Sequence, residues 1–186
     1  MRKLLSACAV AAAFVSAPVF AQGYVGIGFG SSSTNGINSA VILGGNTNKG
    51  LTKVYGGYQF TPNWGVEGQY SDLGSRDLSN VANVKLGDYS VTQYSIAGTG
   101  TLPLSSGFSL LGKLGITANN VRATANVGAS NATSALIGVG VAYSFSPALS
   151  ARLEYEDFGK LGNYNNVLGA GSVKGNGYSI SLKYAF

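Results

Sequence analysis

The chain has 186 residues, a formal charge of +5 and only 10% charged residues, whereas an average globular protein has about 25%. Gly contributes 28 residues, aromatic residues make up 11% of the chain, and His is absent. This composition excludes an ordinary soluble surface and a disordered chain, and the lack of His removes the side chain that most often serves as acid or base near neutral pH.

The N-terminal segment has the pattern of a secretory signal peptide. Arg2 and Lys3 precede an apolar stretch that ends at Pro18, and a cleavage pattern of small residues ends at Ala21. A transmembrane anchor is the alternative, but the stretch is shorter than the roughly 20 apolar residues that a spanning helix needs. We therefore predict that residues 1–21 are a signal peptide.

The remaining residues, 22–186, are predicted to form one domain without Cys, because Cys8 lies in the signal peptide. Removing Arg2 and Lys3 from the 12 basic residues leaves ten, against seven acidic residues, so the domain carries +3. This charge is too small and too scattered to indicate a nucleic-acid partner. A domain exported into an oxidising compartment without a disulfide must be stabilised by other means.

A period of two dominates the predicted domain and indicates β-strands. In the first segment Val25, Ile27 and Phe29 alternate with Gly, and five apolar residues alternate with small or polar ones at the end of the chain. The pattern predicts eight strands, at 23–30, 52–60, 64–70, 89–102, 108–118, 136–145, 150–156 and 178–186.

The predicted connections alternate between short and long. The short ones contain Pro and lie at 61–63, 103–107 and 146–148. The long ones are rich in Gly, Asn and Ser and lie at 31–50, 74–87, 119–135 and 158–176. Three tight turns and four long loops predict an all-β fold, an eight-stranded antiparallel up-and-down transmembrane β-barrel.

The charges of the predicted strands all fall on the small, polar face, and none is left on the apolar face. A basic residue facing lipid at the bilayer midplane costs about 2–4 kcal/mol, so the polar face is predicted to line the lumen. If Ser144 pairs with Ser150, the charged residues of 150–156 oppose Ala142, Gly140 and Gly138, which leave room for them. The predicted lumen charge network is Lys53, Glu67, Lys113, Arg152, Glu154, Glu156 and Lys183.

Aromatic residues gather beside the predicted short turns. Aromatic side chains are favoured in strands generally, but that preference does not explain why they gather there. The position is typical of the aromatic girdle of a membrane barrel. The predicted periplasmic girdle is Phe60, Trp64, Phe108 and Phe145, with Tyr184 and Phe186 at the end of the chain.

Three segments resemble the OmpA-like outer-membrane β-barrel family, which includes opacity-type surface proteins: KVYGGYQFTPNWGVEGQY (53–70), YSFSPALSARLEYEDFG (143–159) and YSISLKYAF (178–186). The resemblance covers nearly all of the predicted domain and implies residence in the outer membrane of a Gram-negative bacterium. It also implies an interior charge network. The sequence shows no peptidoglycan-binding domain, so a cell-wall anchoring role is not carried over from the family. By the same resemblance the barrel assembly machinery reads a C-terminal signal formed by Tyr178, Ile180, Leu182, Tyr184 and Phe186.

Three classes of function are compatible with such a barrel. The first is a non-catalytic surface protein that supports envelope integrity or displays its loops for adhesion. The second is a small, narrow or gated porin-like channel through the charged lumen. The third is an enzyme, which we do not expect, because a Ser nucleophile needs an adjacent base and there is no His to supply it.

No cofactor and no metal are expected. The expected partners are outer-membrane lipid, lipopolysaccharide and the barrel assembly machinery. A host or cell-surface ligand of the loops stays open, and the barrel is expected to be a monomer.

Overall fold

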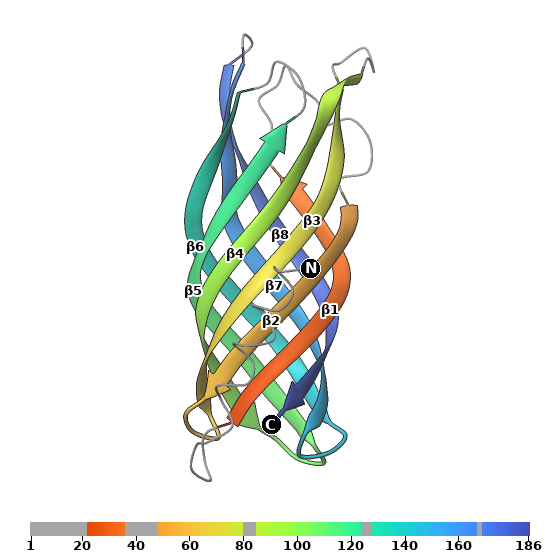
Figure 1. Ribbon diagram of the computed structural model, residues 1–186, viewed down its shortest axis with the longest axis vertical. Helices are drawn as coiled ribbons and strands as arrows, with labels where there is room; N and C mark the ends of the chain where they lie inside the picture. Colours follow the sequence, from red (N-terminus) through yellow and green to blue (C-terminus); the bar gives the residue numbers. More distant parts are fainter. Residues whose placement is uncertain (1–21, 36–47, 80–84, 124–127, 167–168) are drawn as a thin grey trace, which may run out of the picture.

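A computed structural model describes residues 22–35, 48–79, 85–123, 128–166 and 169–186. Eight antiparallel strands form a closed barrel in which each strand pairs with the next and β8 pairs with β1 (Figure 1). This confirms the predicted fold class, whereas the predicted signal peptide lies outside the described residues. The strands are β1 (Gln22–Asn35), β2 (Asn48–Gln59), β3 (Trp64–Ser79), β4 (Lys85–Pro103), β5 (Phe108–Ala123), β6 (Gly128–Ser144), β7 (Leu149–Asn166) and β8 (Gly169–Ala185).

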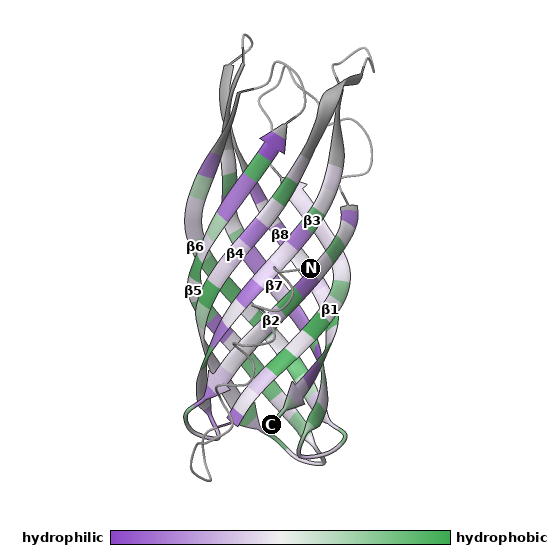
Figure 2. Ribbon diagram, in the orientation of Figure 1, coloured by the Kyte–Doolittle hydropathy of each residue, from purple (hydrophilic) through white to green (hydrophobic). Residues whose placement is uncertain are grey.

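The two faces of the barrel wall differ as the period of two predicts. On β1, Val25, Ile27 and Phe29 are exposed on the outside, while Tyr24 is buried inside. Hydrophobic residues recur between paler or hydrophilic ones along the strands in the lower half of the barrel (Figure 2). The interior of this half is polar and the outside is apolar, which reverses the arrangement of a soluble protein.

Short turns close the end of the barrel that is at the bottom of Figure 1, which we call the turn end; the opposite end is the loop end. The turns are fastened by backbone hydrogen bonds from Phe60 to Trp64 (3.0 Å), from Leu104 to Phe108 (2.9 Å) and from Phe145 to Leu149 (2.9 Å). The aromatic residues predicted to form a girdle are therefore at this end, and their side chains are exposed on the outer wall. In the part of the chain that the structure describes, no helix has the length and apolarity to cross a membrane.

The prediction of four long loops is wrong in extent, because the strands continue into all four segments. β1 runs to Asn35, β3 to Ser79 and β7 to Asn166, and β8 already begins at Gly169. Gly, Ser and Asn made these segments resemble loops by composition. They are strands because single apolar residues such as Leu73 and Phe158 pack into the interior, and strand preference depends on this packing.

Two β-bulges of the same design interrupt the extended strands. In β3 the amide of Gly74 donates to Asp72 Oδ1 at 2.8 Å, and in β7 the amide of Gly159 donates to Asp157 Oδ1 at 2.8 Å. The glycines have φ of 76° and 60°, which Gly adopts without strain. The strand register shifts at both places. Asp72 and Asp157, which lie just beyond the predicted strands 64–70 and 150–156, are exposed on the outer face of the longer observed strands.

Candidate functional site: the barrel lumen

Six of the seven charged residues predicted for the lumen form one connected cluster of buried side chains. They come from β2, β3, β5 and β7, and the alternation of each strand points them inward. The cluster holds three cations and three carboxylates, so it is electrically balanced. We call it the charge network: Lys53, Glu67, Lys113, Arg152, Glu154 and Glu156.

Lys113 is the centre of the charge network. Its Nζ lies 2.6 Å from Glu67 Oε1, 2.7 Å from Glu154 Oε1 and 3.2 Å from Glu156 Oε1. Lys53 reaches two of the same carboxylates, with Nζ at 2.7 Å from Glu154 Oε2 and 2.9 Å from Glu156 Oε2. Every carboxylate of the network therefore contacts at least one ammonium group, which is the condition for burying such charges.

Arg152 extends the network toward the turn end. Its Nη1 donates to Glu67 Oε2 at 2.8 Å, and Tyr24 donates to the same oxygen at 3.0 Å. The guanidinium carbon lies 5.1 Å from the ring centre of Tyr24 and 5.0 Å from that of Tyr55, within the range of cation–π attraction. Lys183, the seventh predicted residue, is only half-buried and lies 5.0 Å from the Tyr24 ring. Among the described residues it contacts no carboxylate, so the structure does not bring it into the network.

The register assumed for β6 and β7 is the one observed, with Ser144 opposite Ser150 and small residues opposite each of the three charged residues. A Cβ added to Gly138 would lie 3.3 Å from side-chain carbons of Glu156 and Lys113. The glycine therefore provides space for the long side chains of the network.

A layer of uncharged polar side chains lies beside the network on its loop-end side. Gln93 Nε2 donates to Asn119 Oδ1 at 3.1 Å, and Gln69 Nε2 donates to Ser71 Oγ at 2.9 Å. Asn119 Nδ2 in turn donates to the carbonyl of Lys160 at 3.0 Å. The two bonds of Asn119 join β4, β5 and β7, whereas the bond between Gln69 and Ser71 lies within β3.

Nearer the loop end, the lumen is filled by an apolar cluster that the sequence analysis missed. Ala97 lies within the predicted strand 89–102, but the other members lie near the ends of predicted strands or in segments predicted as loops. The available signal was the continuation of the period of two: Leu73 follows Ser71, and Phe158 follows Glu156, on the same face. We call this cluster the apolar layer: Leu51, Leu73, Val91, Ala97, Val121, Leu136, Phe158 and Leu161.

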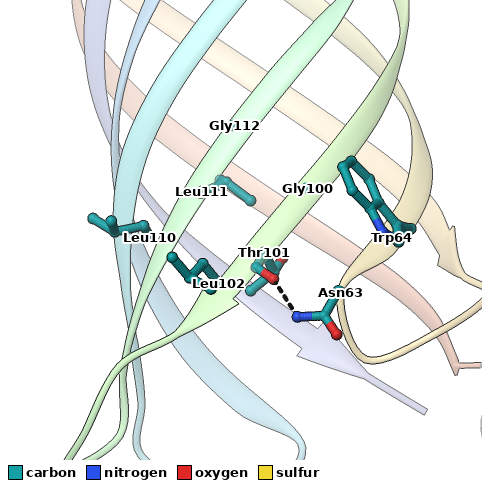
Figure 3. Close-up of a pocket in the computed structure, with 8 residues that line it drawn as sticks. All are labelled: Asn63, Trp64, Gly100, Thr101, Leu102, Leu110, Leu111 and Gly112. Atoms are coloured by element: carbon teal, nitrogen blue, oxygen red, sulfur yellow. Dashed lines mark hydrogen bonds between the residues drawn. The ribbon is translucent and has the colours of Figure 1, made fainter.

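A pocket of about 400 Å³ lies near the turn end, against β3, β4 and β5. Trp64 and Leu110 are on its two sides, and Gly100 and Gly112, which are paired in the strand register, lie between them (Figure 3). The Asn63 side chain beside it donates to the carbonyl of Thr101 at 2.8 Å. Trp64 and Leu110 are exposed on the outer wall, so the pocket is a depression of the apolar surface and holds no acid or base.

The ionised side chains of the charge network are engaged with one another. In the described ranges no three His, Cys, Asp or Glu residues are grouped so that they could hold a metal ion. The carboxylates of the network are already occupied by ammonium and guanidinium groups. The ion pairs of the network link β2, β3, β5 and β7 across the lumen.

A closed antiparallel barrel with an apolar outer wall and a polar, charge-paired interior is the architecture of transmembrane β-barrels, because closure satisfies every backbone group without water. The sequence matches the family model described as outer membrane protein beta-barrel domain over residues 4–186, and the chain belongs to this family. This confirms the resemblance to small outer-membrane barrels. No curated protein matches the sequence.

Solved outer-membrane proteins share the fold at low sequence identity. OprG from Pseudomonas aeruginosa is 14% identical, with a TM-score of 0.66 over 90% of this chain and 97% of that one. Neisserial surface protein A is 15% identical, with a TM-score of 0.62 over 88% and 97%. Ail of Yersinia pestis, in complex with the heparin analogue sucrose octasulfate, is 20% identical, with a TM-score of 0.58 over 90% and 100%.

Because the outer face is apolar, we expect the cost of placing a charge on it to depend strongly on the depth of that position in the membrane. Leu182 is exposed on β8 midway between Tyr178 and Phe186, whereas Leu104 is exposed in a short turn. We expect Leu182→Arg to lower the free energy of unfolding in lipid vesicles by about 2–4 kcal/mol, and Leu104→Arg by about 0–1 kcal/mol. Urea titration of both variants measures the difference. Equal losses would contradict the assignment of the outer face to lipid.

Proposed function

We propose that the protein is a non-catalytic surface protein of the outer membrane, whose closed barrel supports the envelope and displays its loop-end segments to other cells or molecules. The observation that carries this proposal is the charge network. Three cations and three carboxylates neutralise one another across the lumen. An eight-stranded barrel is just wide enough for its side chains to fill the interior. A lumen that is crossed by ion pairs therefore favours a scaffold over an open pore.

The strands beyond the bulges support a role in display. The pairing of β7 and β8 continues to Asn166 opposite Gly169, and that of β3 and β4 to Ser79 opposite Lys85. Binding residues are commonly found on segments that a rigid scaffold positions in this way. Sucrose octasulfate, the compound bound to Ail, is a suitable first probe for a polyanion ligand of this chain.

A narrow or gated channel is the second candidate, favoured by buried polar atoms that lack a hydrogen bond. Gln93 Oε1, Ser150 Oγ and Ser179 Oγ have no partner among the described residues. Unpartnered buried polar groups are costly, and contact with water or a polar solute would satisfy them. The half-buried Lys183 would make the turn-end mouth of such a path positive.

Single-channel recording of the refolded barrel in a planar bilayer separates the two candidates. We expect no steady conductance from the natural sequence. Arg152→Ala should also stay closed, because Glu67 keeps its contact with Lys113 at 2.6 Å. Heat-modifiable gel migration controls for folding. Reproducible openings of the natural protein would contradict the scaffold proposal and make the channel the primary function.

A further inference from the structure

The outer face of the β7–β8 pair changes in steps toward the loop end. Above rows of aliphatic residues, Tyr155 lies opposite Tyr178, then Asp157 opposite Asn176, and then Lys160 opposite Lys174. All six side chains except Asn176 are exposed. The order is that of a membrane surface, in which tyrosines mark the boundary of the hydrocarbon and charged groups follow outside it.

The bulge in β7 places Lys160 on this face. By strict alternation from Glu156 and Phe158, residue 160 would point into the lumen. Gly159 has φ of 60° and the register shifts around it. As a result Leu161 is buried and Lys160 is exposed. Lys174 is exposed by the ordinary alternation of β8, so the bulge brings two lysines into one cross-strand pair.

This pair is electrostatically unfavourable by itself. Like charges directly opposite one another destabilise a β-sheet, and within the described residues neither lysine forms an ion pair. The backbone at Lys160 is also fixed, since its carbonyl accepts hydrogen bonds from Asn119 Nδ2 at 3.0 Å and Ser134 Oγ at 2.7 Å. An anion held between the two ammonium groups would remove the repulsion.

The distance of the lysine pair above the tyrosine row indicates that the anion would come from the lipid headgroups. Lys174 is four residues from Tyr178 on β8, which at about 3.3 Å per residue and the usual strand tilt is about 10 Å above the tyrosine row. The headgroup region adds about 5–8 Å to each side of the hydrocarbon core, and lysine side chains can reach down to it. Both lysine side chains are exposed on the outer face of the barrel wall.

We propose that Lys160 and Lys174 form a binding site for a phosphate group of the outer-leaflet glycolipid, of the lipid A type. The inference rests on the proposed placement of the loop end at the cell surface and deepens it by naming a lipid partner and its site. Two ammonium groups on adjacent strands can share one phosphate, and each adds to the attraction of an anionic lipid surface.

The test compares lipid A with its dephosphorylated form on the intact, detergent-solubilised barrel, with binding followed by native mass spectrometry. The variant is Lys160→Gln with Lys174→Gln. The matched control is Arg122→Gln, which removes an exposed charge from β5. We expect the double variant to bind lipid A about tenfold to thirtyfold more weakly, the control to bind within about twofold of the natural protein, and the natural protein to prefer the phosphorylated form.

Equal binding of the two lipid forms, or an equal loss in the Arg122 variant, would overturn the proposal. Binding of sucrose octasulfate to the same variants tests whether the anion is instead a soluble polyanion. If the double variant no longer binds that compound but still binds lipid A, the lysine pair is a site for a soluble polyanion and the lipid proposal is wrong. Gel migration shows whether each variant is folded. Steady conductance together with intact lipid A binding would refute the scaffold function alone.

Discussion

Replacing Lys113 with Met is expected to lower the free energy of unfolding by about 3–5 kcal/mol, the usual cost of breaking a buried ion pair from one side. Lys113 contacts Glu67, Glu154 and Glu156, and its side chain is 1% exposed. Its loss leaves three buried carboxylates with two cations. Urea titration of the barrel in lipid vesicles measures the effect.

Two further variants distinguish charge imbalance from lost packing. Lys183→Met removes a half-buried lysine that lies outside the charge network, and we expect it to cost less than about 1 kcal/mol. Adding Glu156→Gln to the Lys113 variant restores equal numbers of positive and negative charges and should recover part of the loss. If the second substitution makes the barrel still less stable, the charge-balance explanation fails.

Much of the barrel follows from the sequence because its wall has two contrasting faces. A slip of one residue would move every side chain to the other face, so Lys53, Glu67 and Lys113 together allow only one orientation of their strands. The register assumed for β6 and β7 agrees with the same reasoning, since Glu154 and Glu156 lie opposite Gly140 and Gly138.

The contacts within the lumen were not predictable from the pattern. Alternation places Lys183 and Lys113 on the same face, but only the three-dimensional stagger of the strands decides that Lys113 meets three carboxylates and Lys183 meets an aromatic ring. The pairing of Lys160 with Lys174 was hidden as well, because a bulge reverses the alternation in the middle of a strand.

The apolar layer escaped prediction because its residues are separated by Gly, Ser and charged residues that favour turns. Leu73 and Phe158 each occupy the middle of an Asp-x-Gly segment, which reads as a turn. In the barrel both segments are bulges that insert the central side chain into the lumen, where each is 0% exposed. The repetition of the motif on β3 and β7 was, besides the continued period of two, a sequence feature that could have revealed the layer.

Phe158→Ala tests whether the apolar layer is a structural part of the barrel. Removing a fully buried aromatic ring costs about 3–5 kcal/mol, and the ring of Phe158 fills space next to Gly177, whose added Cβ would lie 3.3 Å from it. Phe29→Ala is the matched control, because Phe29 is 57% exposed on the outer wall. We expect a much smaller loss there, measured by the same urea titration.

The Phe158→Ala variant also tests whether the charge network or the apolar layer keeps the lumen closed to ions. Phe158→Ala leaves all six residues of the charge network in place, so we expect no steady conductance even though the barrel is less stable. A hydrophobic constriction can itself block ions by excluding water. Steady openings in the Phe158 variant would therefore show that the apolar layer is the barrier and that the ion pairs serve only to hold the strands together.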